Sequence, residues 1–233
     1  MDGVRAIFFD IGDTLVFDEP PLRERFRWAT RAVGLTYDDQ RLPQAFRVGQ
    51  EYALACYLGG TDNDDPEVQR EVAARTLAAL GVPPINNARW QALAEAFVSV
   101  PWRRYVHPGA IALLEALRAR GFVVGAISDW EETLPKTLAE LALAPHLDAL
   151  AVSATVGVTK PHPQLFQEAL RQADVCAAES VHIGDWYELD VQGAHAAGMQ
   201  AILFDHQQRS PDADCPRVET FDALAALLLE GTL

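Results

Sequence analysis

Short runs of apolar residues, rich in β-branched and aromatic side chains, recur along the chain, and a stretch with helical periodicity follows each of them. The runs are continuously apolar instead of alternating with polar residues, which is typical of strands buried on both faces of a parallel sheet. Strands that alternate with helices predict a doubly wound, Rossmann-like α/β fold. The predicted strands cover residues 4–9, 123–128, 149–153, 181–184 and 201–204.

The segments between these runs carry apolar residues at helical spacing. Leu113, Leu114 and Leu117 share one face of a predicted helix that starts near Pro108 and ends before Gly121. A glycine at that point suits the position after a helix C-terminus. Further helices are predicted over residues 165–173 and 221–229, and the polar segment 205–216 is predicted to be a loop.

One long region breaks the alternation of strands and helices. From about Phe17 to Arg104 the pattern shows no strand, and helical periodicity covers residues 22–33, 44–57, 66–80 and 88–98. Glycines and prolines separate these helices. We interpret the region as an all-helical domain inserted after the first strand. The predicted domains are therefore an α/β core, residues 1–16 and 105–233, and a helical insertion, residues 17–104.

Composition and charge narrow the classes of function. Hydrophobic residues make up 49% of the 233 residues and charged residues 22%, as in an ordinary globular protein, and the net charge is −14. Because such an acidic surface repels nucleic-acid phosphates and anionic lipid, we expect neither nucleic-acid nor membrane binding. No apolar run reaches about 20 residues. Three widely spaced cysteines indicate reduced thiols and a cytoplasmic location.

Polar clusters follow several of the predicted strands. Asp10 to Thr14 follow the first strand, Ser128 and Asp129 the second, and a Gly-Asp pair that leads to Asp190 follows the fourth, while Lys160 precedes a helix. Ligands of open α/β sheets bind at the carboxyl ends of the strands, so these groups are expected to converge. Each cluster alone is more often a turn or a helix cap, but the combination indicates one site.

At these residues the chain resembles the haloacid dehalogenase-like (HAD) superfamily, which consists mostly of phosphatases. The resemblance rests on FFDIGDTLV (8–16), GAISDW (125–130), GVTKPHPQLF (157–166) and VHIGDWYELDVQGAHAAGM (181–199). It implies that the helical insertion is the cap of this superfamily. The first motif, with its second aspartate one place later than usual, resembles a subgroup of uncharacterised HAD-like hydrolases.

The resemblance assigns roles to individual residues. Asp10 is expected to be the nucleophile, which attacks phosphorus and forms an aspartyl-phosphate. Ser128 and Lys160 are expected to bind and stabilise the transferred phosphoryl group, with Asp129 beside them in the substrate site.

A divalent cation is expected at the same place. Asp10, Asp185 and Asp190 put up to three negative charges together, and a carboxylate can attack an anionic phosphate only if charge is cancelled. Oxygen ligands and a phosphate substrate indicate Mg²⁺. By resemblance, the ligands are the Asp10 carboxylate, the backbone carbonyl of Gly12 and Asp185, with Asp190 behind them or bound through water.

One position departs from the superfamily. Its phosphatases usually carry a second aspartate two residues after the nucleophile, which protonates the leaving group and then activates water. Here Gly12 takes that position, and Asp13 follows it. Asp13 either serves as the acid from its shifted place or only hydrogen-bonds the backbone of the turn.

These observations predict a Mg²⁺-dependent phosphatase of small phosphorylated metabolites, acting as a monomer or homodimer. Two alternatives remain: a haloacid dehalogenase, whose halide leaving group needs no acid, and a non-catalytic phosphoryl-binding protein. The intact acidic motif at Asp185 and Asp190 favours phosphoryl transfer. Arginine and aromatic side chains in the insertion, Trp90 among them, either grip the substrate or form ordinary core and surface.

Overall fold

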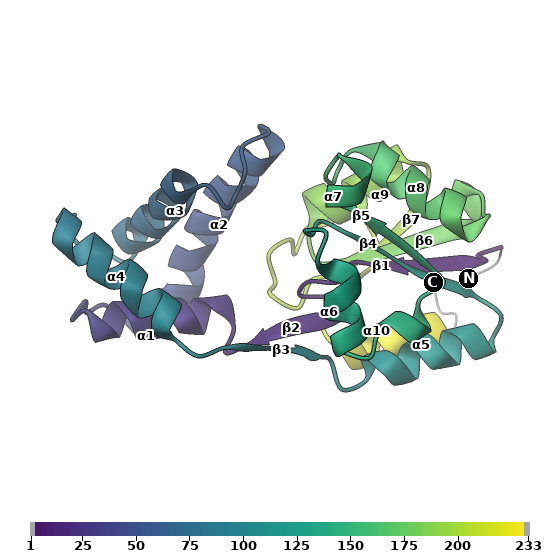
Figure 1. Cartoon of the computed structure of the whole chain (residues 1–233), viewed down its shortest axis with the longest axis horizontal. Coiled ribbons are helices and arrows are strands. Elements are labelled where there is room, and N and C mark those ends of the chain that lie inside the picture. Colours follow the sequence, from purple (N-terminus) through teal and green to yellow (C-terminus); the bar gives the residue numbers. More distant parts are fainter. Residues whose placement is uncertain (1–2, 231–233) are drawn as a thin grey trace. The chain divides into compact units, whose positions relative to one another are not determined.

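The computed structural model describes residues 3–230, and the chain divides into two compact units. One unit takes the residues up to Phe17 and from Arg104 onward, and we call it the core unit. The other, Asp18–Arg103, is the cap unit. Figure 1 shows strands and helices in the core unit and only helices over most of the cap unit. Every helix within residues 3–230 is too short or too polar to cross a membrane.

A six-stranded sheet forms the centre of the core unit, in the order β5-β4-β1-β6-β7-β8, and each neighbouring pair of strands is parallel. This arrangement confirms the predicted doubly wound α/β fold. Because β1 lies between β4 and β6, the residues that follow these three strands are brought to one edge of the sheet. The strands are β1 (Ala6–Phe9), β4 (Val123–Ser128), β5 (Ala149–Val152), β6 (Ser180–Gly184), β7 (Gln200–Phe204) and β8 (Arg217–Val218).

The continuous apolar character of β1 follows from burial of both of its faces. Ile7 and Phe9 belong to one buried cluster and Phe8 to another, and none of the three has any exposed surface. Phe8 pairs in register with Gly125 of β4, where a Cβ would lie only 2.7 Å from the phenylalanine ring. A glycine is therefore needed on β4 for the strands to pair around this ring.

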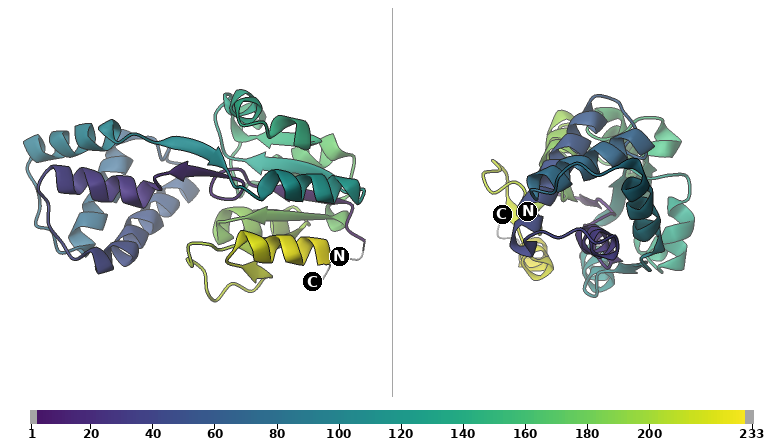
Figure 2. Two further views of the ribbon diagram at one scale, coloured as in Figure 1. Left: turned by 90° about the horizontal axis from the view of Figure 1, so that it is seen from below. Right: turned by 90° about the vertical axis from the view of Figure 1, so that its left-hand side faces the viewer.

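Helices cover both faces of the sheet. The cluster around Ile7 and Phe9 includes Leu114 of α5 (Ala110–Ala119) and Leu224 of α10 (Phe221–Glu230). The cluster around Phe8 includes residues of α8 (Pro163–Ala173) and α9 (Gln192–Ala196). Figure 2 shows the core unit from a second direction, with α10 on one side of the sheet. The remaining helical segments are α6 (Leu134–Glu140), α7 (Ser153–Val156), η2 (Ala144–His146), η3 (Ala177–Glu179) and the π-helical turn η4 (Tyr187–Val191).

Four helices make up most of the cap unit. They pack around their own apolar cluster, which includes Phe26, Leu77 and Leu93. Two of the helices begin at capping side chains: Asp65 accepts a hydrogen bond from the N–H of Glu67, and Asn86 from the N–H of Arg89. The helices are α1 (Leu22–Ala32), α2 (Leu42–Leu58), α3 (Pro66–Ala79) and α4 (Asn87–Ser99), and the short turn η1 (Asp39–Arg41) precedes α2.

The prediction that residues 17–104 hold no strand is wrong at both ends. β2 (Val16–Glu19) pairs with β3 (Arg103–Val106) in a separate two-stranded sheet where the chain passes between the units. Both strands are four residues long and partly charged, and Nε of Arg103 donates to Glu19 across them at 2.9 Å. Cross-strand pairing stabilises this ribbon, and such short segments have no apolar pattern to reveal them. β8, with two residues, was missed for the same reason.

Candidate active site

The site begins where β1 ends. The backbone N–H of Asp10 donates to the carbonyl of Ile183 on β6 at 2.7 Å, which keeps Asp10 attached to the sheet. The chain then turns back on itself, because the N–H groups of Leu15 and Val16 donate to the carbonyl of Ile11 at 3.0 and 2.8 Å. This turn holds Asp10 in a buried position, with 6% of its surface exposed.

Lys160 bridges two carboxylates at the centre of the site. Its Nζ donates to Oδ1 of Asp10 at 2.7 Å and to Oδ1 of Asp190 at 2.6 Å, and the three side chains are 9% exposed or less. Burial alone would lower the pKa of Lys160, but the carboxylates around it outweigh burial and hold the pKa well above its ordinary value. Lys160 is therefore a fixed cation beside the expected nucleophile.

Burial also has the largest effect on the protonation of Asp10. It raises the pKa of the Asp10 carboxyl to about 7, with a further rise from the charge of Asp190 and a partial offset by Lys160. One lysine therefore does not fully neutralise the two acids that it contacts. Asp190 is the more strongly ionised of the pair: burial opposes its charge, but Lys160 and His182 outweigh burial and its pKa lies below the ordinary value.

Asp190 reaches the lysine because of the backbone that follows β6. The π-helical turn η4 brings its carboxylate back against Gly184, where a Cβ would lie 2.1 Å from Cγ of Asp190. Only a residue without a side chain leaves room for this carboxylate. Oδ1 of Asp190 lies 2.9 Å from Nε2 of the buried His182, and Oδ2 accepts from the N–H of Trp186 at 2.9 Å.

The residues after β4 hold Lys160 from its other side. The carboxylate of Asp129 accepts hydrogen bonds from the backbone N–H of Lys160 at 3.0 and 3.2 Å. Ser128 ends β4 next to it and is 1% exposed. Asp129 therefore positions the lysine through the lysine backbone, and the substrate contact expected for Asp129 stays a prediction.

Asp185 pairs with an arginine from the loop after β7. Arg209 donates from Nη2 to Oδ2 of Asp185 and, at 3.1 Å, to its backbone carbonyl, while the guanidinium lies 3.8 Å from the ring centroid of Trp186. Burial raises the pKa of the Asp185 carboxyl well above its ordinary value, although Arg209 opposes this shift. Nε of Arg209 is buried and has no hydrogen-bond partner among the described residues.

The side chain of Asp13 lies close to that of Asp185. Its backbone φ of 53° is left-handed, a conformation that aspartate tolerates better than most residues. Ligand atoms of Asp13, Asp185 and His206 all lie within 4.8 Å of one another, so these three side chains could hold a metal ion. Burial lowers the pKa of His206 to about 4, which leaves the ring neutral and able to act as a ligand near pH 7.

The structure brings most of the predicted site residues into two adjoining groups. Lys160 joins Asp10 and Asp190 and is held by Asp129. Asp185 lies with Asp13, and the charge of Asp10 contributes to the raised pKa of Asp185. The other two predicted residues, Gly12 and Ser128, follow or end strands of the same sheet.

The sequence analysis gives no role to Arg209, His206 or His182. His182 is buried in β6 and contacts Asp190, so it supports an acid of the site. Arg209 and His206 follow β7, at the same edge of the sheet as the other groups. Polar residues that follow parallel strands meet at the same edge of a sheet, and this rule predicts that His206 and Arg209 lie near the site.

The arrangement defines a class of enzyme. A parallel α/β sheet carries a buried aspartate after its central strand, a lysine fixed on that aspartate, and further acids after the next strand, as in hydrolases that use a carboxylate nucleophile. The family model described as haloacid dehalogenase-like hydrolase matches residues 4–198. The chain belongs to this family, which confirms the resemblance seen in its motifs.

Individual relatives agree with this assignment. The chain is 32% identical over 205 residues to haloacid dehalogenase-like hydrolase domain-containing protein 3 of Mus musculus, covering 86% of this chain and 81% of the relative. It is 28% identical to phosphoglycolate phosphatase of Rhodospirillum rubrum, over 96% and 89% of the two chains. A crystal structure of the HAD-hydrolase YfnB of Bacillus subtilis, bound to magnesium, matches with a TM-score of 0.63 at 19% identity, over 97% and 98% of the two chains.

Proposed function

We propose that this hydrolase is a Mg²⁺-dependent phosphatase that acts through an aspartyl-phosphate on Asp10. The observation that carries the proposal is the excess of buried carboxylate over cation. Asp10, Asp185 and Asp190 are each 6% exposed or less, and the pKa values of Asp10 and Asp185 stay raised although Lys160 and Arg209 contact them. A site with this deficit of positive charge favours a further cation.

The donor set fits magnesium. The Asp10 and Asp185 carboxylates and the backbone carbonyl of Gly12 supply hard oxygen ligands, the kind that Mg²⁺ prefers. Asp13 and His206 lie beside Asp185 and extend the set. The similarity in fold to YfnB, whose structure was determined bound to magnesium, supports magnesium as the cation. A bound Mg²⁺ would cancel charge between Asp10 and an anionic phosphate and orient the phosphate for attack.

The residues around Asp10 then perform the transfer. An oxygen of the Asp10 carboxylate attacks phosphorus, the bond to the leaving oxygen breaks, and water later cleaves the aspartyl-phosphate. Lys160 stabilises the charge that develops on the phosphoryl oxygens, and the Ser128 hydroxyl donates a hydrogen bond to one of them. Asp129 and Asp190 act on Lys160 itself, because they fix its backbone and its Nζ.

A small phosphorylated metabolite is the substrate class that we propose. The similarity to phosphoglycolate phosphatase supports a compact, anionic substrate. The proton for the leaving group has no donor at Gly12, and Asp13, exposed and near Asp185, is the nearest acid along the chain.

Hydrolysis of p-nitrophenyl phosphate with and without Mg²⁺ tests the proposal. We expect Mg²⁺-dependent release of nitrophenol by the wild type and by the control Asp222→Asn, an exposed position on α10, but no release by Asp10→Asn. Undiminished activity in EDTA, or halide release from a 2-haloacid by a chain inert toward phosphates, would replace this proposal with a metal-free dehalogenase. Binding of phosphate without any turnover would replace it with a phosphoryl-binding protein.

A further inference from the structure

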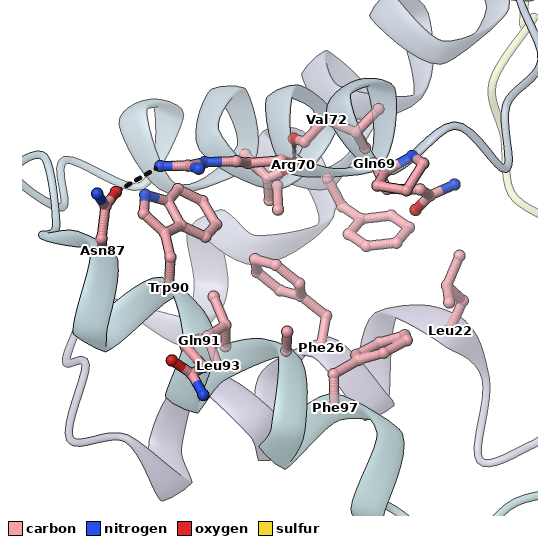
Figure 3. Close-up of a pocket in the computed structure, with 15 residues that line it drawn as sticks. Leu22, Phe26, Gln69, Arg70, Val72, Asn87, Trp90, Gln91, Leu93 and Phe97 are labelled. Carbon is pink, nitrogen blue, oxygen red and sulfur yellow. Dashed lines mark hydrogen bonds between the residues drawn. The ribbon is translucent and has the colours of Figure 1, made fainter.

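The cap unit contains a pocket that lies wholly within its own helices. Its volume is about 530 Å³, and all the residues that line it fall between Leu22 and Phe97. This volume lies within the range of about 300–1,000 Å³ that is typical of small-molecule sites. Figure 3 shows the rings of Phe26, Trp90 and Phe97 around a common space. The core unit contributes nothing to this lining.

Lining residues of the pocket are held in place by contacts with residues behind them. α2 packs tightly on α3 at Gly49, where a Cβ would lie 2.3 Å from Oγ1 of Thr76. On the opposite wall, the guanidinium of Arg25 lies 4.7 Å from the ring centroid of Phe97 and 4.8 Å from that of Trp102. These contacts oppose collapse of the aromatic rings into the space between the helices. The pocket is therefore largely formed before any ligand arrives.

Charge selects the kind of ligand. Among the described residues that line the pocket, none is acidic, although the whole chain carries 33 acidic residues. Arg70 contributes a positive charge to the lining: its Nη2 donates to Oδ1 of Asn87 at 3.0 Å, and its guanidinium lies 5.4 Å from the ring centroid of Trp90. Figure 3 shows this side chain extended along the pocket toward Asn87. An arginine side chain carries five N–H donors, so most of those of Arg70 are left to bind a ligand after this one hydrogen bond.

We propose that the cap pocket binds a small organic anion with an apolar, ring-sized body. The body lies among the phenylalanine and tryptophan rings, and the anionic group pairs with Arg70. The absence of acids from the described lining favours an anionic ligand over a cationic one, because no carboxylate there would pair with a cation, whereas Arg70 can pair with an anion. The inference does not depend on phosphatase activity, since it uses no residue of the core unit and is tested by binding alone.

Anilinonaphthalene sulfonate, an aromatic anion that fluoresces in apolar surroundings, tests the site on the full chain. We expect saturable binding of about one probe per chain, weakened at least about tenfold by Ala94→Trp, which fills the pocket from an exposed position of α4. Ala78→Trp, at an exposed position of α3 outside the pocket, is the matched control and should bind as the wild type does. Equal affinity in the two tryptophan variants would overturn the proposal.

The charge requirement is tested separately with Arg70→Gln, an exposed substitution that leaves the ring walls unchanged. It should weaken binding of the sulfonate about tenfold and leave binding of uncharged N-phenylnaphthylamine unchanged. Equal loss for both probes would refute the pairing with Arg70. Analytical sedimentation of the wild type and Ala94→Trp completes the test. A wild-type dimer that Ala94→Trp dissociates would assign the pocket to a second copy of the chain and overturn the proposed small-molecule site.

Discussion

The glycine two residues after Asp10 leads to a quantitative prediction about leaving groups. If no other group replaces an acid at Gly12, we expect the leaving oxygen of a phosphate ester to depart largely unprotonated and the rate to depend steeply on the pKa of the leaving alcohol. Aryl phosphates should then be hydrolysed far faster than alkyl phosphates. Gly12→Asp supplies the missing acid and should raise turnover of alkyl phosphates selectively.

The structure has room for a Cβ at Gly12. A Cβ at Gly12 would meet only Cζ3 of Trp130, at 3.8 Å, an ordinary van der Waals contact, and the backbone there is not left-handed. Asp13, with φ of 53°, is a different case. Alanine at that φ costs about 1–2 kcal/mol, whereas asparagine tolerates it. Asp13→Asn therefore removes the acid with less backbone strain than Asp13→Ala.

The expected magnitude follows from the contribution of a general acid, about 10²–10⁴-fold in rate, or about 3–5 kcal/mol of activation free energy. We expect Gly12→Asp to raise kcat/KM for an alkyl phosphate such as glycerol phosphate toward the lower end of that range. Turnover of p-nitrophenyl phosphate should change much less, because nitrophenol leaves readily without a proton.

Steady-state kinetics with both substrates decide the matter across the wild type, Gly12→Asp and Asp13→Asn. If Asp13 already supplies the proton, the wild type shows little leaving-group dependence, Asp13→Asn creates it and Gly12→Asp gains nothing. The reasoning about both positions is refuted if the ratio of aryl to alkyl rates is small and equal in all three proteins.

Three further perturbations follow from the site. In EDTA, the raised pKa of Asp10 means that the folded state holds its proton more tightly than the unfolded state, so the free energy of unfolding falls as pH rises from about 4 to about 7. Asp10→Asn should remove this pH dependence of the free energy of unfolding, which amounts to about 4 kcal/mol at most, as measured by urea titrations at several pH values. An unchanged pH dependence contradicts the raised pKa of Asp10. Gly184→Ala should cost about 1–3 kcal/mol and most of the activity by displacing Asp190, and wild-type thermal melting and turnover would disprove this. Arg209→Gln removes the partner of the Asp185 carboxylate and should tighten Mg²⁺ binding about tenfold in calorimetry. Arg171→Gln, at an exposed position, is the control and should leave the affinity unchanged; equal Mg²⁺ affinities of the two variants would contradict a role of Arg209 in competing with the metal.

The sheet could be predicted because its strands carry a strong local signal. Burial of β1 and β4 on both faces requires continuous apolar sequence, and that requirement is visible without knowing the partners of either strand. The ribbon of β2 and β3 could not be predicted. Its stability comes from pairing between segments far apart in the chain and from Arg103 with Glu19, and no short window of sequence contains both sides.

The same division applies to the site. The convergence of Asp10, Lys160 and Asp185 could be expected from their places at the ends of strands. The double contact of Lys160 with Asp10 and Asp190 could not, because it depends on a π-helical turn and on the space above Gly184. The sequence indicates which residues take part, and side-chain packing decides which of them touch.

The central place of β1 in the sheet has a consequence for biosynthesis. Ala6, at the start of β1, pairs with Val123 on one side and Ser180 on the other, and Asp10 meets Lys160 150 positions later in the chain. At about 5–20 residues per second, β1 waits on the order of ten seconds for its first partner strand to be translated. During that time four apolar residues are exposed on a nascent chain, an opportunity for chaperones and for aggregation alike. Asp10 is translated long before Lys160 and Asp190, so its buried surroundings are complete only after those residues have been added to the chain.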